Sequence, residues 1–113
     1  METPVEDVWS LARELAATAA VADDGRAARI VAGGHPATLR QTVVALRAGT
    51  GLAEHEDPGE ATVLVLQGRV RLSWTGGEQQ AAPGELLVVP AGRHALGALQ
   101  DAVVLLTVAV LAG

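Results

Sequence analysis

The chain has 113 residues, enough for one domain with a single core, and half of its residues are hydrophobic while only 19% are charged, which excludes an intrinsically disordered chain. The formal net charge is -5, lysine is absent and the arginines are scattered, so nucleic acid is not expected as a partner. Without cysteine there is no disulfide and no thiolate metal site.

The chain carries no signal for membrane insertion or secretion. Its first residues, METPVED, are acidic where a secretory signal would be basic. The longest apolar run, Ala102–Ala112, is interrupted by Thr107 and is well short of the roughly 20 residues that span a bilayer. We therefore expect a cytoplasmic protein with no membrane partner.

The first 24 residues predict an amphipathic helix and a turn. Thr3 can cap the helix, Pro4 suits its first position, and Glu6 completes a capping box. Apolar residues then recur at helical spacing: Val5, Val8, Leu11, Ala12, Leu15 and Ala19. Trp9 is near this face and is expected to rest on the body of the protein. Asp23, Asp24 and Gly25 end the helix.

From residue 25 onward the pattern is that of short strands. We predict strands at 27–32, 38–46, 61–66, 69–74, 86–89, 94–99 and 102–111. Residues 61–66 are almost wholly apolar, as in a strand buried on both faces, and Gln67-Gly68 is interpreted as a tight hairpin to the next strand. Many short strands with Gly and Pro between them indicate an all-β antiparallel sandwich or barrel spanning residues 25–113.

Two sets of spaced residues resemble the motifs of the cupin superfamily. Gly49, His55 and Gly68 match its first motif, and the second is matched by Gly84, Pro90, Gly92 and His94. Together they span Gly49 to Ala98, about half of the chain. The resemblance implies a small antiparallel jelly-roll β-barrel, and in active cupins the motif residues bind one divalent metal inside it.

The sequence departs from those motifs at the metal ligands. Asp57 stands where the family has its second histidine, and Ala61 stands where it has a glutamate. His94 comes one place early, and a shift of one residue turns a strand side chain to the opposite face unless a bulge corrects it.

Two interpretations of the site remain open. His55, Asp57 and His94 could form a two-histidine, one-carboxylate set for Fe, Mn, Ni or Zn, with open positions for a substrate. Alternatively, Asp57 caps the turn that continues through Pro58 and Gly59, and His94 is held by a backbone carbonyl. The site then persists as a polar pocket for a ligand.

Three functions follow, from different classes. The first is a barrel that binds a small molecule in its aliphatic cavity without a full metal site, with His55, Asp57 and His94 near the ligand. The second is a metal-dependent enzyme of oxygenase or isomerase type that uses those three residues. The third is an interaction module that acts as a homodimer, because the strand at 102–111 is apolar on both faces and needs a cover.

Overall fold

The computed structural model describes residues 3–33, 38–55 and 60–109, and for residues 53–55 it describes the backbone alone. One helix precedes the strands: α1 (Val8–Val21). The strands are β1 (Arg26–Gly33), β2 (Leu39–Leu46), β3 (Gly51–His55), β4 (Glu60–Gln67), β5 (Val70–Trp74), β6 (Gly77–Ala81), β7 (Leu86–Val88), β8 (His94–Ala98) and β9 (Ala102–Ala109). Among the described residues no helix is long and apolar enough to cross a membrane.

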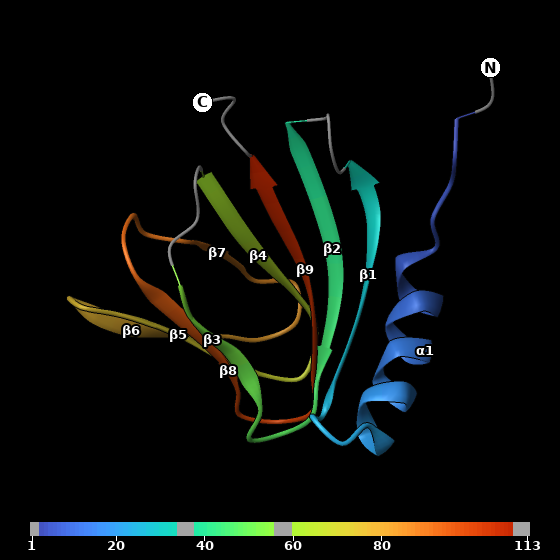
Figure 1. Cartoon of the computed structure of the whole chain (residues 1–113), viewed down its shortest axis with the longest axis horizontal. Helices are drawn as coiled ribbons and strands as arrows, with labels where there is room; N and C mark the ends of the chain where they lie inside the picture. Colours follow the sequence, from blue (N-terminus) through green and yellow to red (C-terminus); the bar gives the residue numbers. More distant parts are fainter. Residues whose placement is uncertain (1–2, 34–37, 56–59, 110–113) are drawn as a thin grey trace.

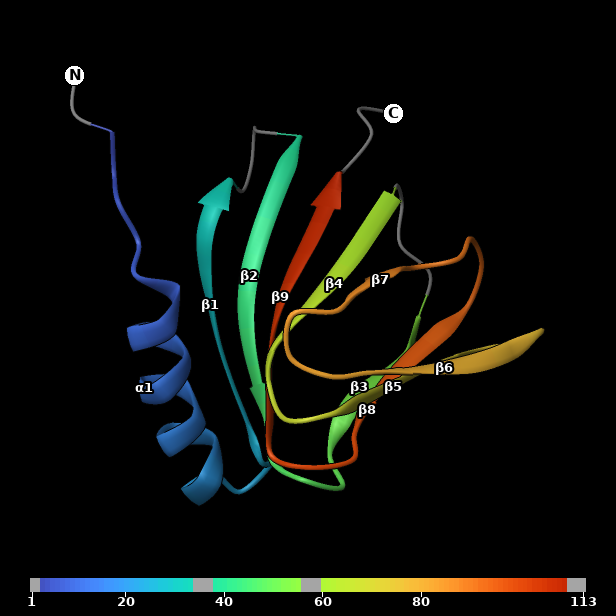
Figure 2. The same ribbon diagram turned by 180° about the vertical axis from the view of Figure 1, so that it is seen from behind.

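The strands form two antiparallel sheets that face each other. One has the order β1-β2-β9-β4-β7 and the other the order β3-β8-β5-β6. Figures 1 and 2 show the four-stranded sheet on one side of the five-stranded sheet and α1 on the other. This arrangement confirms the predicted all-β jelly roll with one N-terminal helix.

The predicted hairpin at Gln67-Gly68 is wrong. Strand β4 pairs with β9 and β7, whereas β5 pairs with β6 and β8, so the chain crosses from one sheet to the other at this point. The true hairpin joins β5 to β6, where Trp74 pairs with Gly77 across Thr75 and Gly76.

The helix begins later than the capping box predicts. Asp7 is its N-cap: its carboxylate accepts hydrogen bonds from the backbone nitrogens of Trp9 at 3.1 Å and Ser10 at 3.2 Å. The Ser10 hydroxyl adds a third at 2.9 Å. These hydrogen bonds, those from Ser10 foremost, hold the pKa of the Asp7 carboxyl below its usual value.

The helix buries its apolar face on the outer side of the five-stranded sheet. Leu11, Ala12, Leu15 and Ala19 pack with Val43, Ala45, Leu66 and Val103 to form what we call the helix core. Burying each leucine there contributes roughly 1.5–3 kcal/mol. Trp9 is 55% exposed, so the expectation that it rests on the barrel is wrong.

A second cluster, the inner core, fills the space between the sheets. Its largest fully buried members are Leu46, Leu72, Val65, Val70 and Val104. Strands β4 and β9 contribute to both cores, which explains why their sequences are apolar on both faces. Trp74 is partly buried and packs against the inner core, on the same face of β5 as Val70 and Leu72.

The motif glycines occupy backbone conformations that other residues rarely adopt. Gly49, Gly68, Gly84 and Gly92 all have φ between +76° and +94°. At Gly68 there is also no room for a side chain, because a Cβ would lie 2.1 Å from the carbonyl oxygen of Asp101. This close approach lets the chain turn from β4 toward β5 against the start of β9.

Candidate functional site

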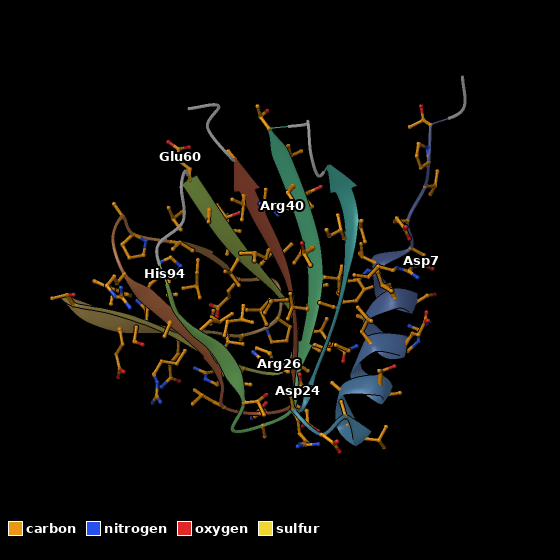
Figure 3. All side chains as sticks on the ribbon, viewed as in Figure 1. Asp7, Asp24, Arg26, Arg40, Glu60 and His94 are labelled. Carbon is orange, nitrogen blue, oxygen red and sulfur yellow. The ribbon has the colours of Figure 1, made fainter. Side chains whose placement is uncertain are left out.

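A small pocket lies where β4 and β8 begin. It has a volume of about 100 Å³ and is lined by Glu60, Ala61, Val89, Pro90, Ala91, Gly92 and His94. We call it the His94 pocket. Figure 3 shows Glu60 and His94 at the same end of the sandwich. The pocket therefore joins the second motif to the start of β4.

His94 faces the interior. It is 5% exposed, and it alternates along β8 in phase with Leu96 and Ala98, both members of the inner core. The early position of His94 therefore does not turn its side chain outward. The residue at the position of the family's histidine, Ala95, is the one on the outer face of this strand.

A backbone carbonyl orients the imidazole of His94. Its Nδ1 lies 3.1 Å from the carbonyl oxygen of Gly92, and because a carbonyl can only accept, Nδ1 carries the proton. In the neutral ring Nε2 is then the nitrogen with a lone pair. The structure thus shows His94 both buried at the pocket and held by a backbone carbonyl, and its role as a metal ligand stays a prediction.

The other predicted site residues are only partly described. The backbone of His55 ends β3, where it is the cross-strand partner of His94, and Trp74 of β5 is the partner on the other side. The side chain of His55 and the whole of Asp57 lie outside the described residues. Within the part of the chain that is described, no three His, Cys, Asp or Glu residues come together as a metal site.

Ala61 takes the place of a carboxylate in this pocket. It is 5% exposed, belongs to the inward-facing row of β4 with Val63 and Val65, and lines the pocket with His94. A methyl group offers a metal no ligand. Of the described lining residues, His94 and Glu60 carry potential metal donors, and the alternation of β4 puts Glu60 out of phase with the inward-facing Ala61. A metal centre at His94 would therefore draw its other ligands from His55 and Asp57.

A wider groove opens between the sheets along β1 and β3. It has a volume of about 390 Å³, and we call it the Leu52 groove. Its apolar floor is formed by inner-core side chains from three strands, Val44, Leu52 and Leu106. It is also lined by Asp24, Arg26, Ala27 and Ala28. The sequence gives no local signal for it, because its walls come from strands far apart in the chain.

The charges at the lower end of the groove are tied together. The Nε of Arg26 lies 3.7 Å from Oδ2 of Asp24, and Nη1 donates to the carbonyl oxygen of Gly51 at 3.3 Å. This second contact links β1 to β3 across the two sheets. Figure 3 shows Asp24 and Arg26 together at one end of the sandwich and Arg40 toward the other end of β2.

Sequence comparison places the chain in a family. The model of the cupin domain family matches residues 42–110. This range includes both motifs, most of β2 and all the strands from β3 to β9. The chain belongs to the cupin family. No curated protein matches it by sequence.

Solved structures share the cupin fold with this chain. A conserved protein of unknown function from Streptococcus pyogenes matches with a TM-score of 0.77 and 27% identity, over 100% of this chain and 92% of that chain. A cupin superfamily protein from Desulfitobacterium hafniense matches with a TM-score of 0.73 and 19% identity, over 98% and 94%. A salicylate 1,2-dioxygenase from Pseudaminobacter salicylatoxidans matches with a TM-score of 0.72 and 21% identity, over 89% and 33%. The last two likenesses concern the fold alone.

Proposed function

We propose that this cupin binds a small, largely apolar molecule between its two sheets, in the Leu52 groove. The observation that carries the proposal is the groove itself: its volume of about 390 Å³ is within the range of small-molecule sites, and its floor is aliphatic. Burial of an apolar ligand on such a floor is favourable because it removes hydrocarbon surface from water.

The absence of a carboxylate at position 61 supports binding in preference to metal-dependent catalysis. Family enzymes need several ligands around one ion, and the buried methyl group of Ala61 removes one of them.

A larger space of about 440 Å³ lies on the outer face near Pro4 and Val8, outside the sandwich. It contains Glu6, which is paired with Arg29 at 3.6 Å, and it has no link to either motif.

The test uses 1-octanol as an apolar probe and a variant that narrows the groove. Ala28 is exposed and lines the groove, so Ala28→Leu adds bulk there without disturbing the inner core. Ala17→Leu is the matched control, because Ala17 is exposed on the helix away from the groove. Isothermal titration should show binding to the wild type and to Ala17→Leu, with a loss of affinity in Ala28→Leu. Equal affinity in all three proteins would refute the assignment to this groove.

A metal-dependent enzyme of oxygenase or isomerase type is the second candidate. Its support is the orientation of His94, whose Nδ1 is held by Gly92 and whose cross-strand partner is His55. In this candidate His55, Asp57 and His94 hold the ion, and the ion would supply Lewis-acid or redox chemistry. Metal analysis of untagged protein tests it: stoichiometric Fe, Mn, Ni or Zn that is lost in His94→Gln would favour the enzyme over the binding barrel.

A further inference from the structure

We infer that the ligand of the Leu52 groove is a small organic anion, a carboxylate with an apolar body, and that Arg40 binds its charged end. The inference rests on the proposed function, because it names the chemical class of the ligand for that groove. It depends on the position of one arginine and on the partners of all the others.

Arg40 projects from the inner face of the five-stranded sheet. The register between β2 and β9 is unbroken from Leu39 to Leu46, so Arg40 shares its face with Val44 and Leu46 of the inner core. Its cross-strand partner is Val108, which is buried. The arginine therefore rises from an apolar row at the open end of the same face that forms the floor of the groove.

The guanidinium of Arg40 has no protein partner among the described residues, and it is exposed. Every other arginine is engaged. Three form ion pairs: Arg26 with Asp24, Arg29 with Glu6 and Arg71 with Glu78. Three donate hydrogen bonds: Arg13 to the Ser10 hydroxyl, Arg47 to the carbonyl oxygens of Ala20 and Ala22, and Arg69 to the Gln80 side chain. Arg93 also has an interaction partner. Arg40 is thus the cation whose donors are available to a ligand.

The spacing suits a ligand of moderate length. Arg40 is four residues from Val44 on β2, which corresponds to about 13 Å at ~3.3 Å per residue. Leu106, which pairs with Thr42, lies between them on the same face and forms part of the floor. An acyl chain on Val44 and Leu106 would place its carboxylate at the guanidinium, where two parallel N–H donors match two oxygens.

Among the described residues, the two charges that line the groove are paired with each other, which leaves Arg40 as the cation proposed for the ligand. Asp24 and Arg26 offset each other at the opposite end of the groove. Glu60 lines the separate His94 pocket. The alternation along β4 places Glu60 in the outward-facing row, whereas Ala61 and its cross-strand partner Val108 are on the inner face. Since the whole chain carries a formal charge of -5, long-range attraction does not favour anions, and recognition has to come from this local cation.

The test compares octanoate with 1-octanol, which have the same apolar length and differ in charge. Isothermal titration is done with the wild type, with Arg40→Gln and with Arg13→Gln, which removes the same charge from the exposed face of the helix. We expect the wild type and Arg13→Gln to bind octanoate about tenfold more tightly than octanol, and Arg40→Gln to bind the two probes alike.

Each outcome separates this inference from the proposed function. If octanol binds and octanoate is not preferred, or if the preference survives in Arg40→Gln, the role of Arg40 is refuted while the apolar groove remains. If neither probe binds to the wild type, the groove is not the ligand site and both proposals fail. Circular dichroism of Arg40→Gln confirms that the variant is folded, which is expected because Arg40 has no described partner to lose.

Discussion

Restoring a carboxylate at position 61 tests whether the His94 pocket is as buried as its geometry indicates. In Ala61→Glu the new carboxyl would enter a pocket of about 100 Å³ next to His94, from a position that is 5% exposed. A charged carboxylate without a partner in such a place costs about 3–5 kcal/mol of folding free energy. Ala61→Gln has nearly the same size and no charge, so it measures the cost of volume alone.

The difference between the two variants should depend on pH. Burial raises the pKa of the new carboxyl above its unfolded value of about 4.3, so the protonated form is favoured in the folded state. Below that pH Ala61→Glu and Ala61→Gln should be equally stable. As pH rises, Ala61→Glu should lose about 1.4 kcal/mol per pH unit until the folded pKa is passed, and urea unfolding between pH 4 and pH 8 measures this loss.

Divalent metal should reverse that loss if His94 is available as a ligand. A metal at 100 times its dissociation constant stabilises the folded state by about 2.7 kcal/mol. Mn or Zn should therefore stabilise Ala61→Glu at pH 7 and leave Ala61→Gln unchanged. Thr62→Glu, on the outer face of β4, is a control that should show neither effect. If Ala61→Glu and Ala61→Gln have the same unfolding free energy at every pH, residue 61 is not in a buried pocket and the reasoning fails.

Two further predictions concern the frame. Gly84→Ala should cost about 1–2 kcal/mol, because φ is +85° and a Cβ there meets no atom within 4 Å. Gly68→Ala has a similar φ but also places its Cβ 2.1 Å from the carbonyl oxygen of Asp101, so we expect a loss above about 3 kcal/mol by urea unfolding. Equal losses of unfolding free energy in the two variants would contradict the close approach of Gly68 to the Asp101 carbonyl. Because the pKa of Asp7 is lowered by its hydrogen bonds with Ser10, its charge stabilises the helix above pH about 3.9, and this stabilisation is lost as pH falls through the lower folded pKa. Thermal unfolding should show Asp7→Asn less stable than the wild type at pH 7, with a difference that disappears at pH 2; a difference that is constant with pH would refute this role.

The sequence was sufficient for the frame because the motif residues have strict backbone requirements. Gly49, Gly68, Gly84 and Gly92 stand where φ is positive, so their spacing carries the geometry of the turns directly. The apolar strands were equally readable, since burial on two faces makes most positions of β4 and β9 apolar; the polar exceptions are Glu60, Thr62, Gln67 and Thr107. Local backbone chemistry and hydrophobicity thus determine most of this fold.

Features that depend on choices between similar local signals were not readable. Thr3 and Asp7 are both suitable N-caps, and the helix begins at Val8, directly after the second of them. Strand β6 escaped prediction because four of its five residues are exposed, so it has no apolar alternation. The crossing at Gln67-Gly68 resembles a hairpin in sequence, because a glycine between two strands does not say to which sheet the second strand belongs.

The sequence predicted which residues belong to the candidate site, but not how their side chains are arranged in space. The motif spacing identified His94 and Ala61, but the sequence did not show which way the side chain of His94 points. In the structure His94 lies on the same face of β8 as the buried Leu96 and Ala98, so it points inward. Arg40 had no distinguishing feature among scattered arginines. The role that we propose for it rests on the partners that the other arginines have in three dimensions.

The helix changes the basis of the expected homodimer. That expectation came from the apolar outer face of the last strand, but Val103 on this face is 1% exposed because α1 packs over it. The helix therefore covers part of the apolar outer face of β9 within one chain. The homodimer stays a prediction. We now expect its interface at the edge strand β7, where Leu86 and Val88 are 57% and 74% exposed. An apolar edge strand with unpaired backbone groups on one side is the kind of surface that a second copy can cover.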